Sequence, residues 1–176
     1  MSTGNISAPY PPPLDASPQR AKDMLIAGAP AAEVLTFLAV VAESVAPEGS
    51  AASILALDRD GLLRNAASPR LPADRLDAID RLRPDANVGT CTAAAATGQI
   101  VLTPDFTAEA KWAELKHLPL AIGYRSASSV PIKGAAGQVP GTFGYYYREP
   151  RTPSSEEMIA TTRLAELAAS ALSNRH

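Results

Sequence analysis

The sequence contains a single cysteine, Cys91, whose thiol is the side chain with the clearest potential for chemistry. It lies in the segment VGTCTAAAATGQIV, where Thr90 is placed to cap a short helix. In the first turn of such a helix, unpaired amides and the helix dipole favour a thiolate, which would be a nucleophile or a redox centre. The competing interpretation is a small buried side chain beside a sheet, because burial raises the pKa of a thiol. No histidine lies near Cys91 in the sequence to act as a base, and this favours the packing role.

Other patterns that would indicate catalysis or metal binding are weak. A thiol enzyme that closes an intramolecular disulfide needs a second cysteine, which this sequence lacks. His117 could ligate haem, but a surface or half-buried helical histidine is the commoner role. The sequence has no metal-ligand spacing, no nucleophile elbow and no phosphate loop. We therefore expect no catalytic residues and no metal, and the sequence names no cofactor.

Composition narrows the class of protein further. The sequence has a hydrophobic content of 46% and a charged content of 19%, which are typical of a globular domain. Its formal net charge of −2 gives no electrostatic attraction to nucleic acid or anionic lipid. The apolar runs are too short and interrupted to span a bilayer, and the N-terminus lacks the pattern of a secretory signal. A lone cysteine suits a reducing compartment. We expect a cytoplasmic protein with no nucleic-acid or membrane partner.

The first thirty residues differ in composition from the rest. The stretch MSTGNISAPYPPPLDASP is rich in proline and serine and favours an extended polyproline conformation. We interpret residues 1–30 as a Pro-rich tail with a short helix in QRAKDMLIAGAP that stops at Gly28 and Pro30. A docking peptide for a proline-recognising partner is the alternative.

The elements that would position the remaining residues follow one another from residue 31 onward. Residues 31–46 have helical spacing, and ASILALD and LLRNAAS read as a hairpin around the turn RDG. LPADRLDAIDRL returns to helical spacing, with Leu76, Ile79 and Leu82 along one side. After the cysteine segment come a short strand in QIVLT, an irregular helix in TAEAKWAELKHLPLAIG, and strands in YRSASSVPI and VPGTFGYYYRE. The last segment predicts a long helix, with Ser154 and Glu157 at capping-box spacing.

Several of these segments resemble the GAF domain family of small-molecule sensors. DRDGLLRNAASPRLP is similar to the family's second strand, and VGTCTAAAATGQIVLTPD to its Gly-Ser-Cys-Gly-Thr-Ala-Ala segment. YRSASSVPI and GQVPGTFGYYYREPRTPSSEE are similar to the family's last two strands and the entrance of its final helix, and Trp112 stands where a tryptophan is common. The subgroup concerned occurs in bacterial sensor kinases, cyclic-nucleotide turnover proteins and transcriptional regulators. The resemblance assigns residues 31–173 to one GAF domain.

The sequence also departs from this subgroup. Thr92 and Ala93 stand where glycine and threonine are usual, and Ser128 or Ser129 falls where a tryptophan is common. A missing bulky side chain would leave room for a cavity beside that strand. A mostly apolar concavity with a few polar groups is what a small-ligand site requires.

The resemblance implies an α+β fold, an α/β/α sandwich with a mostly antiparallel sheet of about five to six strands flanked by helices. It also implies that the first and last helices pack together on one face, and it places a ligand pocket between the sheet and residues 91–103 and 106–122. The candidate lining residues are Cys91, Phe106, Trp112, Tyr124, Ser126, Ser128 and Thr142.

The function implied by the resemblance is a sensing or signal-receiving domain that is not an enzyme and has no output domain on this chain. It would bind an unidentified small molecule, form a homodimer through helices 31–46 and 154–173, and act on a downstream signalling protein. Two apolar lines along the last helix favour the dimer. Two alternatives remain: a thiol redox enzyme or sensor that uses Cys91, similar to methionine sulfoxide reductases of this fold but disfavoured by the single cysteine, and a purely structural dimerisation domain.

Overall fold

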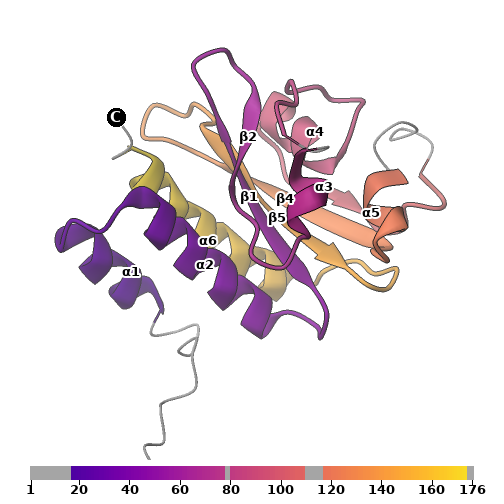
Figure 1. Cartoon of the computed structure of the whole chain (residues 1–176), viewed down its shortest axis with the longest axis horizontal. Coiled ribbons are helices and arrows are strands. Elements are labelled where there is room, and N and C mark those ends of the chain that lie inside the picture. Colours follow the sequence, from indigo (N-terminus) through magenta and orange to yellow (C-terminus); the bar gives the residue numbers. More distant parts are fainter. Residues whose placement is uncertain (1–16, 78–79, 110–116, 174–176) are drawn as a thin grey trace, which may run out of the picture.

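The computed structural model describes residues 17–77, 80–109 and 117–173, which form a sheet between two layers of helices (Figure 1). The strands of the sheet are β1 (Ala51–Leu57), β2 (Leu63–Ala67), β3 (Val101–Thr103), β4 (Ser126–Ile132) and β5 (Gly141–Tyr147). The helices on one face are α1 (Ser17–Ile26), α2 (Ala31–Val45) and α6 (Ser155–Ser173), and those on the other are α3 (Ala73–Leu76), α4 (Thr90–Thr97) and α5 (His117–Ala121).

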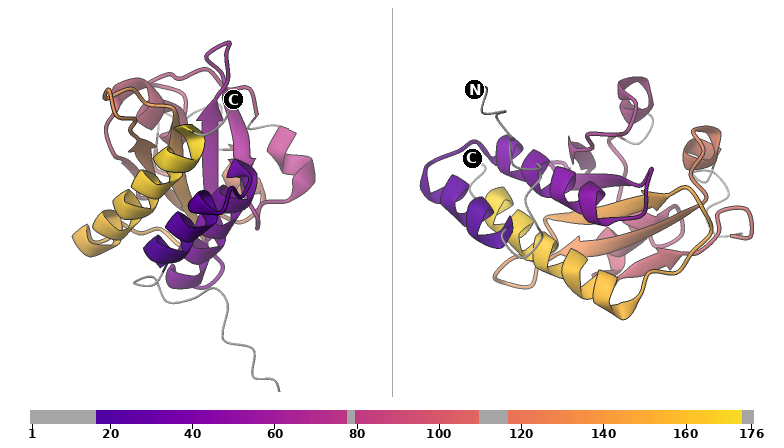
Figure 2. Two further views of the ribbon diagram at one scale, coloured as in Figure 1. Left: turned by 90° about the vertical axis from the view of Figure 1, so that its left-hand side faces the viewer. Right: turned by 90° about the horizontal axis from the view of Figure 1, so that it is seen from below.

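The five strands lie in the order β2-β1-β5-β4-β3, and every neighbouring pair is antiparallel. Figure 2 shows α2 and α6 running side by side beneath the sheet, with the shorter helices on the opposite side. The predicted α+β fold is therefore confirmed, including the antiparallel sheet of five strands and the packing of the first and last long helices on one face. None of the described helices combines the length and the apolar character needed to cross a membrane.

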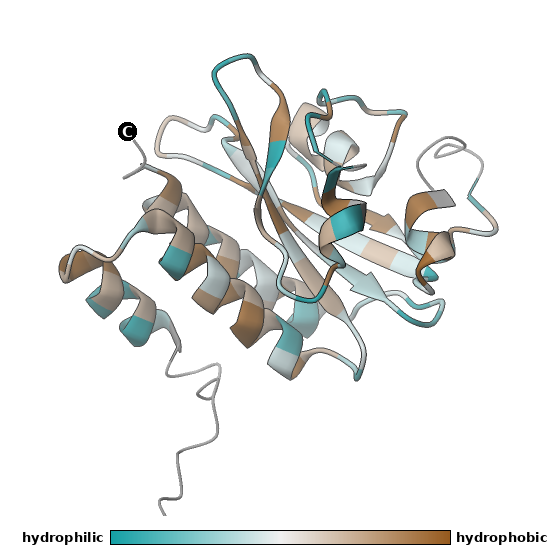
Figure 3. Ribbon diagram, in the orientation of Figure 1, coloured by the Kyte–Doolittle hydropathy of each residue, from teal (hydrophilic) through white to brown (hydrophobic). Residues whose placement is uncertain are grey.

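The main core lies between the sheet and the long helices. Helix α2 presents a buried apolar face that includes Val34, Leu38 and Val41, and Figure 3 shows hydrophobic residues recurring along this helix. From β5, Phe143 and Tyr145 point into the same core. This core fixes the sheet and leaves its other face to the shorter helices.

Helix α6 begins at the capping box that its sequence predicts. The Ser154 Oγ accepts a hydrogen bond of 3.1 Å from the Glu157 N–H, and the Glu157 carboxylate accepts one of 3.2 Å from the Ser154 N–H. These two bonds satisfy amides that the first helical turn leaves unpaired.

The two apolar lines of α6 are both covered within the chain. Ala165 and Ala168 belong to one line and Leu164 and Ala171 to the other, and all four are buried in the main core. Helix α6 packs on β4 and β5 and against α1 and α2. The chain itself thus accounts for both lines, which the sequence interpretation divided between the sheet and a second subunit.

The N-terminal segment contributes to this helix layer. Residues 1–16 lie outside the described part of the chain, and residues 17–26 form α1, in the region where the sequence predicts a short helix. Ala21 of α1 is fully buried, and Met24 and Leu25 pack against the same core. Helix α1 therefore covers part of α2 and α6.

The helix predicted over LPADRLDAIDRL is shorter than its periodicity indicates. Helix α3 ends at Leu76, and Leu82 forms an isolated antiparallel bridge with Leu63 of β2, through hydrogen bonds of 2.7 and 3.2 Å. Arg81 adopts a left-handed conformation with φ of 63°, which no helix continues through. Pairing with the edge strand β2 thus takes the place of the last predicted turn, while Ile79 lies outside the described residues.

Candidate ligand-binding site

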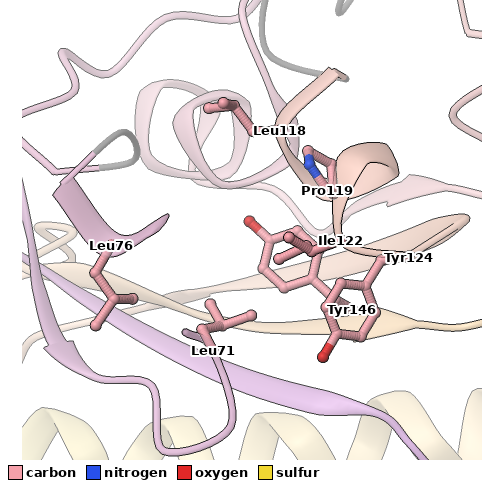
Figure 4. A pocket seen from close by; sticks show the side chains of 7 residues that line it. All are labelled: Leu71, Leu76, Leu118, Pro119, Ile122, Tyr124 and Tyr146. Atoms are coloured by element: carbon pink, nitrogen blue, oxygen red, sulfur yellow. The ribbon is translucent and has the colours of Figure 1, made fainter. Parts of the chain in front are cut away.

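The face of the sheet opposite the long helices carries a small cavity. Its lining is apolar and aromatic and consists of Leu71, Leu76, Leu118, Pro119, Ile122, Tyr124 and Tyr146. Figure 4 shows the two tyrosines lying close together, with leucines from the α3 region on one side and residues of α5 above. The space open to the centre of a water molecule is about 20 Å³, which is roughly the room that one water needs.

The two tyrosines form the floor of this cavity. Tyr146 comes from β5 and Tyr124 from the connection between α5 and β4, and their ring centroids lie 5.7 Å apart. Burial raises the pKa of Tyr146, so its hydroxyl stays protonated and remains a hydrogen-bond donor. Figure 4 shows the two hydroxyls pointing to different sides of the site.

Short helices roof the cavity. Leu118 and Pro119 belong to α5, which has five residues, and Leu76 ends α3, which has four. Each helix is little more than one turn, and isolated helices of this length are not stable by themselves. Their position depends on packing against the sheet and on the loops around them.

Next to the cavity, Cys91 lies in the first turn of α4, as its sequence predicts, but the Thr90 side chain does not cap the helix. Gly89 is the N-cap residue, and the Thr90 hydroxyl shares a hydrogen bond of 2.8 Å with that of Thr103. Cys91 is buried, and burial raises the pKa of its thiol. Burial is the largest influence on this thiol, and the geometry supports the packing interpretation of Cys91.

Two hydroxyls flank this cysteine and lie on the same face of the sheet. Ser129 is paired with Gly144 across β4 and β5, and Thr142 is two residues before Gly144 on its strand. Both hydroxyls lower the pKa of Cys91, although less than burial raises it. Neither Ser129 Oγ nor Thr142 Oγ1 makes a well-formed hydrogen bond to any described residue, and both side chains are fully buried. Both hydroxyls interact with the Cys91 thiol, and neither residue lines the cavity.

The structure divides the predicted lining residues between two faces. Tyr124 lines the cavity, whereas Cys91 and Thr142 do not, although Thr142 shares a face of β5 with Tyr146 and Cys91 packs over that face from α4. Phe106 is buried against Ala93 of α4, in a cluster that Tyr146 also contacts. Trp112 lies outside the described residues.

Ser126 and Ser128 point the other way, into the layer of long helices. The Ser128 hydroxyl lies 3.1 Å from that of Tyr147, and the Ser126 hydroxyl donates a hydrogen bond of 2.6 Å to the Glu149 carbonyl. The prediction grouped these serines with Tyr124 by extending strand alternation back to residue 124. Strand β4 begins only at Ser126, so that alternation does not reach Tyr124.

Sequence reasoning missed most of the apolar lining. Tyr146 could have been found, because alternation along GTFGYYY places it on the same face as Thr142. Leu118, Pro119 and Ile122 belong to the segment 106–122 that the resemblance placed at the pocket, although none was named as a lining residue, and Leu71 carries no such signal. Among the described residues, no group of three or more His, Cys, Asp or Glu is arranged to hold a metal ion.

Comparison with known proteins agrees with this architecture. The family model described as a GAF domain matches residues 29–173. A curated protein of Methanosarcina acetivorans, the methyl sulfide methyltransferase-associated sensor, is 31% identical over 143 residues, which is 81% of this chain but 14% of that protein. This chain therefore corresponds to a small part of that sensor.

Solved structures show the same fold at low sequence identity. The GAF domain of a phosphoenolpyruvate-protein phosphotransferase from Coxiella burnetii has a TM-score of 0.72 and 16% identity, over 91% of this chain and 92% of that one. Free methionine-R-sulfoxide reductase from Neisseria meningitidis, solved with its substrate, has a TM-score of 0.71 and 17% identity, over 91% of this chain and 86% of that one. The family match covers the whole sheet and the helices α2 to α6, and on this evidence the chain belongs to the GAF domain family.

Proposed function

We propose that this GAF domain is a sensing domain that binds a small, mostly apolar molecule between the sheet and the helices α3 and α5. The observation that carries the proposal is the cavity, whose lining is apolar apart from the hydroxyls of Tyr124 and Tyr146. The hydroxyls of Tyr124 and Tyr146 offer hydrogen bonds to a polar group of the ligand. The similarity to a protein named as a sensor supports this reading.

Binding requires the roof of the cavity to move. The present space of about 20 Å³ is too small for a metabolite, so a ligand displaces α5 or α3 outward as it enters. The shortness of these two helices supports this movement. The small volume also favours a second candidate, in which the domain is a purely structural dimerisation unit with a filled interior.

The proposed sensor has no catalytic output. Its single cysteine is buried and its thiol pKa is raised, which disfavours the thiolate that a redox enzyme needs. The methionine-R-sulfoxide reductase of Neisseria meningitidis shares the fold at 17% identity, a likeness that concerns the fold alone.

We further propose that the domain acts in the cytoplasm as a homodimer that signals to another protein. Val45, at the end of α2, is 50% exposed, and Ile159, in the first turns of α6, is 55% exposed. The two helix ends are neighbours, because Val45 and Ala160 line one groove. Two exposed apolar side chains near this groove support a contact between subunits at this place. Sedimentation that shows only monomers at micromolar concentration would contradict the dimer.

The binding proposal is tested by thermal shift and calorimetric titration against a panel of small metabolites. Leu118→Trp fills the cavity from the roof, and Ile100→Trp adds the same side chain at a residue that is 46% exposed and does not line it. We expect at least one compound to raise the Tm of the wild type and of Ile100→Trp but not of Leu118→Trp. No shift with any compound, in a folded protein, would favour the structural candidate.

A further inference from the structure

Arg148 connects the wall of the cavity to the loop that follows α2. It comes directly after β5, and its side chain reaches two loops that are distant in the sequence. Its Nη1 donates a hydrogen bond of 2.6 Å to the Ile122 carbonyl, and its Nε donates one of 3.3 Å to the Gly49 carbonyl. Its guanidinium carbon also lies 4.1 Å from the centre of the Tyr124 ring. One side chain thus holds three backbone or ring partners.

Two of these partners belong to the cavity lining. Ile122 and Tyr124 both line it, so Arg148 contacts the cavity wall from outside. Gly123, between them, has φ of 90°, and a Cβ at this residue would lie 2.6 Å from Arg148 Nη1. Glycine is needed here both for the backbone conformation and for the close approach of the guanidinium.

The third partner belongs to the helix layer. Gly49 lies in the loop between α2 and β1, four residues after the end of α2, and its φ is 83°. A Cβ at Gly49 would come within 3.1 Å of Arg148 Cγ. The Ser50 N–H donates a hydrogen bond of 3.0 Å to the Pro47 carbonyl, which makes this loop a compact turn. The guanidinium therefore rests against a tight turn that is continuous with α2.

From this geometry we propose that Arg148 is a positioning residue that couples occupancy of the cavity to the C-terminal end of α2. The inference rests on the proposed binding in that cavity. A ligand that lifts the roof moves the Ile122 carbonyl relative to Gly49. The guanidinium is planar and rigid, so it cannot span a longer distance between the two carbonyls. When the Ile122 carbonyl moves, either the α2–β1 loop moves with it or one of the two hydrogen bonds of Arg148 breaks. We expect a second arrangement of this bridge in the occupied domain, so that occupancy of the cavity selects between the two.

Arg151 provides a matched comparison on the same segment. Its guanidinium carbon lies 4.7 Å from the centre of the Tyr147 ring, and it forms two hydrogen bonds, of 2.8 and 2.9 Å, with Glu157 in the first turn of α6. Like Arg148, Arg151 packs on a tyrosine ring and connects to the helix layer, although its hydrogen bonds go to a carboxylate rather than to backbone carbonyls. It does not contact the cavity lining.

The test is a double-mutant cycle read by hydrogen exchange of backbone amides, with no ligand present. Leu118→Ala removes apolar contacts that hold α5 at the cavity. Hydrogen exchange is then measured at two amides: that of Tyr124, which donates a hydrogen bond to the Pro119 carbonyl, and that of Ser50. In the wild-type background we expect Leu118→Ala to speed exchange at both amides several-fold. With Arg148→Gln the effect at Tyr124 remains and the effect at Ser50 disappears.

Two further variants separate coupling from a merely structural role. Arg148→Lys keeps the positive charge but loses the planar guanidinium with its two donors, so Leu118→Ala should no longer affect exchange at the Ser50 amide, as with Arg148→Gln. In the Arg151→Gln background, Leu118→Ala should still speed exchange at the Ser50 amide. Additive effects of Leu118→Ala and Arg148→Gln at the Ser50 amide would overturn the proposal, as would equal loss of coupling with Arg151→Gln. Because the cycle uses no ligand, its failure would leave the binding proposal standing, and a failed ligand screen would leave this coupling measurable.

Discussion

The sulfur of Cys91 lies over Gly144, so close that a Cβ at residue 144 would be 3.1 Å from it. This contact joins the first turn of α4 to the middle of β5, and the absence of a side chain at residue 144 makes room for the thiol. The two residues are separated by more than fifty positions in the sequence, yet the small size of Gly144 is what allows Cys91 to pack against the sheet. Cys91 fills the space that Gly144 leaves, which supports the packing interpretation of this residue.

The first prediction concerns this contact. Gly144→Ala places a methyl group against Cys91 Sγ at 3.1 Å and against the Ser128 carbonyl at 3.3 Å, so these neighbours must move by a few tenths of an ångström. We expect a loss of about 1–3 kcal/mol in the free energy of unfolding, measured by urea denaturation. Adding Cys91→Ala removes the contact with the sulfur, so the double variant should be more stable than the sum of the two single effects. Strict additivity would show that the two residues do not share this space.

The second prediction concerns the reactivity of Cys91. Because burial raises the pKa of the thiol and blocks access, alkylation by iodoacetamide at neutral pH should be much slower in the native protein than in urea. The thiol titrates at a higher pH in the folded chain, so its contribution to stability is complete below the unfolded pKa of about 8.5 and is lost as pH rises through the folded pKa. Fast labelling of the native protein, or rapid sulfenylation by dilute peroxide, would restore the redox interpretation.

The third prediction concerns Glu43, a buried carboxylate on α2. It accepts a hydrogen bond of 3.1 Å from the Ala52 N–H and lies 3.8 Å from Arg70 Nε, yet burial dominates and raises its pKa. Its contribution to stability is therefore full below the unfolded pKa of about 4.3 and falls as pH rises through the folded pKa.

Glu43→Gln keeps an acceptor for the Ala52 amide and removes this titration. The stability of the variant relative to the wild type should improve between pH 4 and pH 7, as measured by urea denaturation at each pH. A constant difference between the two proteins across this range would mean that Glu43 has an unshifted pKa.

The fourth prediction concerns the start of α6. Ser154→Ala removes the acceptor for the Glu157 amide and should lower the free energy of unfolding by about 1 kcal/mol. Ser155→Ala, at the next residue and exposed, is the matched control and should change stability little. Equal effects of the two substitutions would show that the capping box does not stabilise the helix.

The sequence carried enough information for the elements whose signals are local. The periodicity of residues 31–46, the turn RDG and the spacing of Ser154 and Glu157 are each determined by neighbours within a few residues, and α2, the β1–β2 hairpin and the start of α6 agree with them.

The rest depends on contacts between distant segments. Leu82 pairs with Leu63, nineteen residues earlier, and the hydrophobic periodicity around Leu82 predicts a helix rather than this pairing. Helix α1 covers a surface of α6 that the sequence interpretation assigned to a second subunit. The cavity combines residues from α3, α5 and β5 with residues from the connections between them, such as Leu71 and Ile122. Ser126 and Ser128 share a face of β4 with Val130 and Ile132, which lie in the main core, whereas Tyr124 precedes the strand and is placed by the loop.

The central claim is that a small molecule occupies the cavity beside Tyr124 and Tyr146. Native mass spectrometry of the purified chain tests it most directly, because it weighs the folded protein with whatever it retains. We predict a wild-type protein that carries additional small-molecule mass, from the purification or after incubation with a compound identified by thermal shift, and a Leu118→Trp variant that carries none. Bare chain mass in the wild type under both conditions, or the same added mass in Leu118→Trp, would contradict the account.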